Sequence, residues 1–260
     1  MKKSFSFFST ASLFFLFILP ANVTAAVQNY DSHASIEFRS GSEFPGIVDP
    51  EKPDPNHPVY PEDPTNPNGP EQGTKGPLSI DFASSFDFGN HEISNKDQSY
   101  FARPQTYKGK DGNVTPNYVQ ITDDRGTGGG WVLKIKQKGQ FTATEKVEYE
   151  TLDGAEILLT HPKLESNSIE QRKPVPVDNI RLDPNGAESI IVAAQNGTGM
   201  GTWADHWGEI RETTETDSHR RTQVVSINDG VILEIPGTTP KSAVTYRTEL
   251  VWTIADIPET

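Results

Sequence analysis

GGGWVLKIKQKGQF (residues 128–141) and YRTELVWTIADIP (residues 246–258) share one pattern, although they lie far apart in the chain. Each contains a tryptophan, one arbitrary residue and then a branched aliphatic residue, at Trp131 and Trp252 respectively. The chain has only 4 tryptophans, so this repetition places half of them in one kind of sequence. The repeat is therefore either a packing device of a β-core or part of a binding surface.

Successive side chains of a β-strand point to opposite faces, so alternate residues share a face. In the first stretch Trp131 and Leu133 lie on one face, and lysines occupy the other. In the second stretch Tyr246, Trp252 and Ile254 share a face. The alternation predicts two half-buried strands whose tryptophans point towards the core. A role of these five residues in ligand contact stays open.

The chain from Leu78 onward consists of similar short apolar runs separated by turn signals such as Asn185-Gly186. The Asn228–Gly230 stretch reads as the turn of a hairpin. Apolar residues do not recur with a helical period of 3.6 over three turns in any segment. We therefore expect an all-β domain over residues 78–260, a sandwich or jelly-roll-like fold. The runs are NYVQITD, WVLKIKQK, EILLT, SIIVAAQ, QVVSI, VILEIP and AVTYRTELVWTI, after an opening LSIDFASSFDFG.

Three segments precede this domain. Residues 1–26 combine two lysines, a short apolar run and small residues, which predicts a cleaved secretory signal peptide. Residues 27–47 form a short mature N-terminus in which Ile36 and Phe38 alternate like one strand; it is either disordered or adds to another sheet edge. Residues 48–77 are acidic and rich in proline. We expect an extended, solvated polyproline II spacer there, because proline fixes φ and donates no backbone hydrogen bond.

Composition excludes several classes of function. There is no cysteine, which removes thiol catalysis, disulfides, thiolate metal sites and an acylated-cysteine anchor. The formal net charge is −13, and removal of the signal peptide leaves 21 basic against 36 acidic residues. Such a charge repels nucleic acid and anionic membrane surfaces. We expect an exported, soluble protein with no membrane insertion after signal cleavage, so any attachment to a cell is non-covalent.

A second aromatic site lies in NGTGMGTWADHWGE (residues 196–209), where Trp203 and Trp207 flank Asp205 and His206. Aromatic rings beside carboxylates and amides are typical of sugar binding, because rings stack on the apolar faces of pyranoses. The alternative is a glycine-rich loop whose tryptophans cover the edge of the sandwich. Both interpretations stay open.

The sequence predicts no catalytic constellation, no cofactor and no metal site. His206 and Glu209 form an isolated H-x-x-E without a second histidine, and no G-x-S-x-G elbow is present. The adjacent acids Asp123 and Asp124 would point to opposite faces of a strand, which does not suit a glycosidase pair. A non-enzymatic protein is therefore expected.

The two tryptophan stretches, together with GPLSIDFASSFDFG at the domain start and GTGMGTW in the middle, make the chain resemble the small WxL-domain surface proteins of Gram-positive bacteria. The resemblance covers roughly residues 76–260. The signal peptide and the acidic proline-rich spacer also fit the layout of that family. Ile254 stands where leucine is usual, a change of similar volume.

The resemblance implies attachment to the cell wall through peptidoglycan. It also implies complexes with other WxL proteins and a membrane-anchored WxL-interacting protein, and, for some relatives, adhesion to host extracellular matrix. A structural or interaction subunit held mainly by partner proteins is the alternative. Candidate contact residues are Trp131, Leu133, Trp203, Trp207, Tyr246, Trp252 and Ile254.

Overall fold

The computed structural model describes residues 28–109, 112–169, 172–216 and 221–256. It divides the chain into two units, Met1–Phe38 and Arg39–Thr260. The predicted signal peptide lies outside the described residues. In the first unit the described residues 28–38 contain no strand, so the pairing of this segment with another sheet stays a prediction. The second unit is described below.

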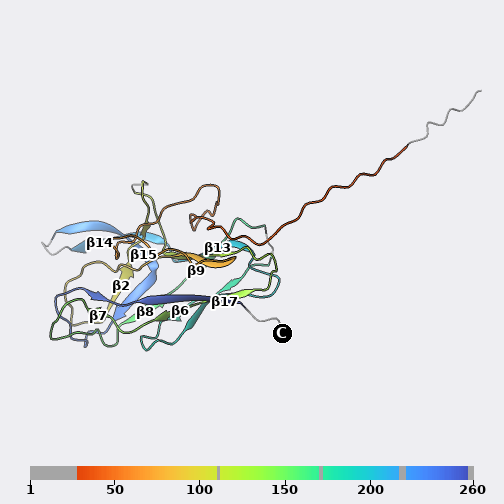
Figure 1. Cartoon of the computed structure of the whole chain (residues 1–260). Coiled ribbons are helices and arrows are strands. Elements are labelled where there is room, and N and C mark those ends of the chain that lie inside the picture. Colours follow the sequence, from red (N-terminus) through yellow and green to blue (C-terminus); the bar gives the residue numbers. More distant parts are fainter. Residues whose placement is uncertain (1–27, 110–111, 170–171, 217–220, 257–260) are drawn as a thin grey trace, which may run out of the picture. The chain divides into compact units, whose positions relative to one another are not determined.

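The second unit contains three antiparallel sheets, which confirms the predicted all-β class (Figure 1). No helix occurs in the described residues. The β13 sheet has the order β1-β5-β13-β9. Its strands are β1 (Leu78–Ala83), β5 (Tyr118–Asp123), β13 (Gly201–Trp207) and β9 (Pro162–Glu165).

The β6 sheet has the order β10-β12-β6-β17 and lies below β13 and β9 in the view of Figure 1. Its strands are β10 (Val175–Pro176), β12 (Ser189–Ala194), β6 (Trp131–Gln137) and β17 (Leu250–Asp256). Along β6 buried and half-buried residues alternate strictly, with Trp131, Leu133 and Ile135 buried. The alternation predicted from the sequence is thus confirmed for this strand.

The β15 sheet has the order β11-β8-β15-β14, with β2 also paired to β15. Its strands are β11 (Ile180–Arg181), β8 (Glu156–Leu159), β15 (Thr222–Ile235), β14 (Ile210–Thr216) and β2 (Gln98–Ala102). Two short pairs complete the fold. They are β16 (Tyr246–Arg247) with β7 (Thr142–Ala143), and β3 (Gln105–Thr106) with β4 (Val114–Thr115).

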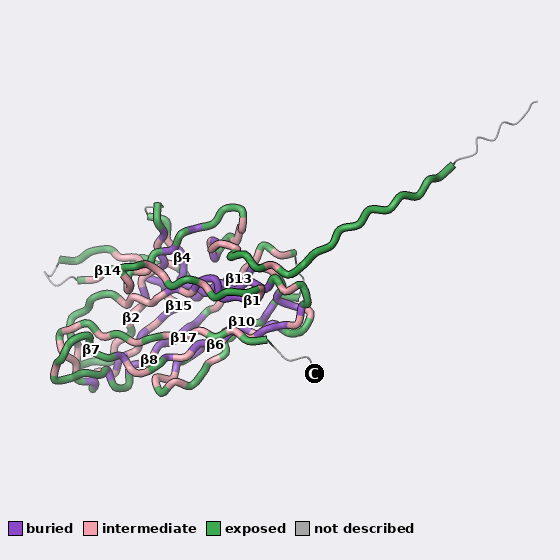
Figure 2. Tube along the Cα trace, viewed as in Figure 1, coloured by how far each residue is buried: buried purple, intermediate pink, exposed green. Residues whose placement is uncertain are grey.

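One hydrophobic core receives side chains from all three sheets. It contains Trp131 and Leu133 from β6, Trp203 and Trp207 from β13, and Ile157 from β8, among others. Figure 2 shows buried residues along β6, β8 and β13, whereas β14 is exposed or half-buried. Burial of this apolar surface is the main force that holds the sheets together.

The stretch Asn228–Gly230 is not a hairpin turn, in contrast to the sequence prediction. It lies inside β15, where the register shifts between Asn228 and Ile232. The Asn228 side chain donates to Asn117 Oδ1 and accepts the Gly230 N–H, so its amide stabilises a bulge. A Cβ on Gly230 would lie 2.3 Å from Gly208 N, which explains the glycine. The bulge lets one long strand pair with β14 through its first half and with β2 through its second.

The proline-rich segment is largely exposed, but it contacts the domain at several points. Val48 and Val59 are buried, and Val59 joins Tyr118 and Phe82 in a second cluster on the outer face of the β13 sheet. The compact unit Arg39–Thr260 includes this segment, and the bounds of the β domain at residues 78–260 stay a prediction. The proline pattern gives no sign of this packing, because the aliphatic residues between the prolines supply the buried surface.

Polar side chains of the β13 sheet provide the hydrogen bonds that anchor this segment. Gln120 Oε1 accepts the Val48 N–H at 2.8 Å, and its Nε2 donates to Gly46 O at 2.8 Å and to Asp81 Oδ2 at 2.9 Å. Tyr118 Oη donates to Val48 O. Further along, Thr74 N donates to Ile80 O, so the segment also covers the outer edge of β1. An edge strand covered in this way is protected from pairing with other chains.

The described residues include no helix of the length and apolarity required to cross a membrane.

We predict that Gln120→Leu releases the proline-rich segment from the β13 sheet. The change leaves the buried Val48 N–H without a partner, which costs about 1–3 kcal/mol of unfolding free energy. The Asp81 carboxyl loses the bond from Gln120 but keeps those from Ser79 and Thr122. Urea unfolding measures the loss, and limited proteolysis should show faster cleavage within residues 39–77. Gln195→Leu, at an exposed glutamine, is the matched control. Equal cleavage rates for both variants would contradict the anchoring role.

Candidate functional site

The two tryptophan motifs lie side by side in the structure. β17 pairs antiparallel with β6, so that Trp252 is opposite Ile135 and Ile254 is opposite Leu133. The inward faces of both strands join the main core, where Trp131 and Leu133 are completely buried and Trp252 and Ile254 are partly buried. The repetition in the sequence therefore builds two neighbouring strands of one sheet.

Trp131 connects the β6 sheet to the backbone that precedes β13. Its Nε1–H donates to Gly199 O at 2.9 Å. Gly199 has φ 83°, and a Cβ there would lie 2.6 Å from Ala194 Cβ and 2.7 Å from Trp131 Nε1. A glycine is thus required both by the left-handed backbone and by the close approach of the indole. Trp131 and Leu133 present no surface to a ligand.

Trp203 and Trp207 belong to strand β13, not to a loop, and neither is accessible to solvent. Trp203 Nε1 donates to Met200 O at 3.0 Å. The sequence did not reveal this strand because both of its faces are buried, so apolar and polar residues do not alternate. These two residues therefore pack in the core and are not part of an exposed sugar-binding loop.

Between these tryptophans lies a buried carboxyl group with no hydrogen-bond partner. Asp205 has the parity of Trp203 and Trp207, its exposure is 0%, and both of its oxygens lack a partner in the described residues. Burial raises the pKa of Asp205 well above its ordinary value. On the other face of the strand, burial and the nearby Lys163 lower the pKa of His206 to about 4. Burial thus favours the neutral form of both groups.

Five aromatic rings form a continuous row of buried and half-buried side chains at one side of the core. Trp252 stacks on Trp207 with centroids 6.1 Å apart, and Phe86 meets Trp207 edge to face at 6.3 Å. Phe88 then contacts Phe86 at 6.5 Å and Phe141 at 6.4 Å. The separations and angles are those of favourable aromatic pairs. We call these residues the aromatic row.

The outer members of the aromatic row line a large groove of about 1450 Å³. Phe86, Phe88, Phe141 and Trp252 lie in its wall, and Tyr100 and Tyr246 add two further rings. Ligand pockets for small molecules are usually about 300–1,000 Å³, so this volume suits a segment of a polymer better. We call this feature the aromatic groove.

Of the seven residues predicted as contacts, only Trp252 and Tyr246 line the aromatic groove. Tyr246 Oη donates to Tyr149 O at 2.7 Å and accepts the Ser242 N–H, which fixes the loop before β16. Ile254 packs against the core and is absent from the groove wall.

The sequence reading missed Phe86 and Phe88 as groove residues. The available signal was SSFDFG, in which two aromatic residues alternate directly after small residues that end β1.

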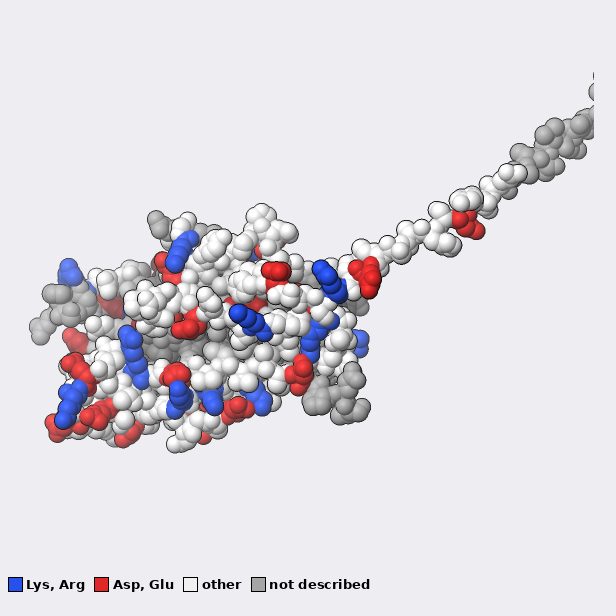
Figure 3. Space-filling view, viewed as in Figure 1, with Lys and Arg blue, Asp and Glu red and all other residues white. Residues whose placement is uncertain are grey.

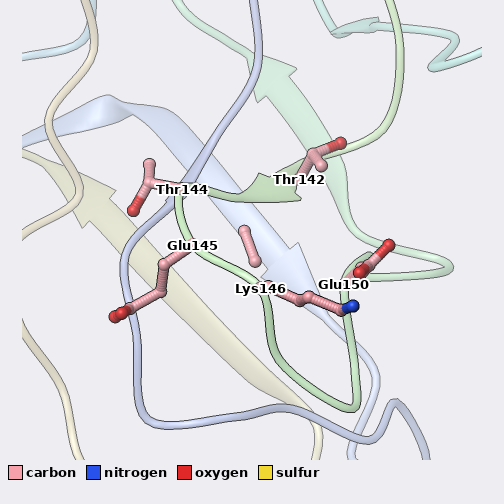
Figure 4. Close-up of a pocket in the computed structure, with 6 residues that line it drawn as sticks. Thr142, Thr144, Glu145, Lys146 and Glu150 are labelled. Carbon is pink, nitrogen blue, oxygen red and sulfur yellow. The ribbon is translucent and has the colours of Figure 1, made fainter.

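Other features of the surface are less specific. Figure 3 shows basic and acidic side chains interspersed over the visible face. A smaller hollow of about 270 Å³ lies around β7 and is lined by threonine, Lys146 and two glutamates (Figure 4). In the parts of the chain described, no cluster of three or more His, Asp or Glu residues is suited to hold a metal ion.

Comparison with known proteins gives one result. A family model described as WxL domain surface cell wall-binding matches residues 25–258. No curated protein and no solved structure matches the chain.

We predict that Gly199→Ala destabilises the fold by about 2–5 kcal/mol, because it adds left-handed strain to a collision with Trp131. Chemical denaturation monitored by tryptophan fluorescence measures the change. Gly139→Ala is the matched control, since nothing lies within 4 Å of its Cβ and it is not left-handed. A cost of less than about 0.5 kcal/mol for Gly199→Ala would show that the indole is not held as described.

We predict that Asp205→Asn stabilises the protein at neutral pH but not in acid. The pKa of the Asp205 carboxyl is 3.8 in the unfolded chain and is raised in the folded protein. As pH rises above the unfolded pKa, the wild-type protein therefore loses up to about 1.4 kcal/mol of unfolding free energy per pH unit, until the folded pKa is reached. The gain in unfolding free energy over wild type should therefore be large near pH 7 and vanish near pH 4. The effect of His206 is common to both proteins and cancels. A gain that is independent of pH would argue against a buried neutral aspartic acid.

Proposed function

This chain belongs to the WxL domain surface cell wall-binding family, and we propose that it attaches non-covalently to the bacterial cell surface by binding peptidoglycan in the aromatic groove. The family supports association with the cell wall. The finer assignment, to peptidoglycan and to this groove, is our proposal, together with export by the N-terminal signal peptide and the absence of enzymatic activity.

The observation that carries the proposal is the set of half-buried rings in the groove. Phe86, Phe88 and Trp252 are held by packing on one side and line the groove on the other. Rigid rings of this kind stack on the apolar faces of sugars with little loss of side-chain entropy. Peptidoglycan offers such faces along each glycan strand.

The net negative charge of the chain favours ring stacking on sugars over electrostatic adsorption to the wall as the mode of attachment. The chain has a net charge of −13, and anionic wall polymers would be repelled by it. Attachment to the wall therefore depends on contacts that tolerate negative charge, such as ring stacking and hydrogen bonds to hydroxyl groups.

A second candidate function is that of an interaction subunit held on the surface by partner proteins. Strand β14 favours it, since it pairs only with β15 among the described strands and is exposed along most of its length. An uncovered edge can accept a strand of another chain. The partners proposed from the resemblance are larger WxL proteins, a membrane-anchored WxL-interacting protein and host extracellular matrix. Retention on cells but not on purified wall would favour this function.

We predict that removal of groove rings weakens wall binding without loss of the fold. Trp252→Leu and Tyr100→Leu keep an apolar side chain but remove a stacking surface worth about 0.5–1.5 kcal/mol, which corresponds to a loss of affinity of roughly twofold to tenfold. Co-sedimentation of the purified chain with insoluble peptidoglycan measures binding, and cooperative unfolding verifies the fold.

Tyr60→Leu is the matched control, because Tyr60 is 66% exposed and lies outside the groove. If wild type stays in the supernatant at all peptidoglycan concentrations, direct wall binding is refuted. If all three variants bind like wild type, the groove is not the contact surface.

A further inference from the structure

The aromatic groove is strongly acidic. Seven of its lining residues carry a carboxyl group, whereas only Lys241 and Arg247 are permanently cationic. Over the whole chain the ratio of acidic to basic residues is 36 to 23, so the groove is more acidic than the protein as a whole. Lys241 Nζ donates to the backbone oxygens of Ser94 and Thr239, which commits part of its hydrogen-bonding capacity to the fold.

Three of the groove carboxylates are exposed and have no ion-pair partner within the described residues. They are Glu71, Glu92 and Glu145, on three separate segments of the chain. A groove that gathers unpaired negative charge raises the local concentration of cations. Its ligand is therefore expected to carry positive charge.

The spacing of these groups argues against a single metal ion. No set of three or more acidic or histidine side chains among the described residues converges closely enough to hold one. Carboxylates distributed around a groove of about 1450 Å³ suit a ligand whose charges are also distributed. The rings of Phe86, Phe88 and Trp252 add apolar faces and a weak attraction for cations.

We propose that the aromatic groove prefers an amine-bearing glycan, that is, a strand in which glucosamine residues carry free ammonium groups in place of N-acetyl groups. The rings stack on the pyranose faces, and the carboxylates pair with the ammonium groups. This inference rests on the proposed function of the groove as a peptidoglycan site and names the sugar chemistry that the site selects. A basic peptide would satisfy the charge but has no pyranose faces, so the row of rings favours the sugar.

The test compares two soluble ligands of equal length, a glucosamine hexamer and an N-acetylglucosamine hexamer. Isothermal titration with the purified chain should give a dissociation constant for the glucosamine hexamer that is roughly tenfold lower at low salt. The difference should shrink as ionic strength rises, because added salt screens the exposed charges. A second experiment compares co-sedimentation of the chain with native peptidoglycan and with chemically N-acetylated peptidoglycan.

Charge variants link the preference to the groove. Glu92→Gln and Glu145→Gln should each weaken binding of the glucosamine hexamer by about twofold to fivefold, and by more than they weaken binding of the acetylated hexamer. Glu148→Gln is the matched control, since Glu148 is exposed beside Glu145 but does not line the groove. All three residues lie on the surface, so folding is expected to be unaffected.

The outcomes separate the two proposals. Sedimentation with peptidoglycan but equal affinity for both hexamers overturns the amine preference and leaves wall binding intact. Failure to bind peptidoglycan in any form overturns the proposed function itself. Tighter binding of a lysine hexamer than of the glucosamine hexamer would assign the groove to a basic peptide and overturn the sugar assignment.

Discussion

The pairing of β6 with β17 is the constraint on which the rest of the structure depends. It joins two segments that are far apart in the chain and sets Ile254 opposite Leu133 and Trp252 opposite Ile135. From this one ladder, Trp131 reaches across to Gly199 O and fixes the start of β13. Trp252 reaches across to Trp207 and fixes its end. The two tryptophan motifs thus hold the β6 sheet to both ends of the same strand.

The groove follows from this arrangement. Trp252 packs on Trp207, which also contacts Phe86, so these rings bring strand β17 and the segment after β1 to one wall of the groove. The core beneath the groove contains Asp205 Oδ1, Asp205 Oδ2 and Trp207 Nε1, which are buried without a hydrogen-bond partner among the described residues. Unsatisfied buried polar atoms are rare in folded proteins. The net stabilisation of this region therefore comes from the apolar and aromatic packing around these atoms.

Short-range patterns allowed the all-β class and several strands to be predicted, but not the strand order. The alternation along WVLKIKQ is a property of the strand itself, and the inward direction of Trp131 and Leu133 follows from it. Strand β13 escaped prediction because its second face is covered by residues 46–61, which are distant in sequence. The same long-range contact hid the packing of the proline-rich segment, since Gln120 shows no sign in the sequence that it binds Val48. The groove could not be predicted for the same reason, because only the fold brings Phe88 and Trp252 to the wall of one groove.

Trp252 is shared between the core and the groove, and this divides the residues of the site into two kinds. One part of its ring packs on Trp207 and supports the fold, and the remainder lines the groove. A substitution there changes stability and binding together, as it does for Phe86. The groove carboxylates Glu92 and Glu145, by contrast, are exposed. Ring stacking is thus tied to the architecture of the domain. The choice among related glycans depends instead on surface charges that can change at little cost to stability.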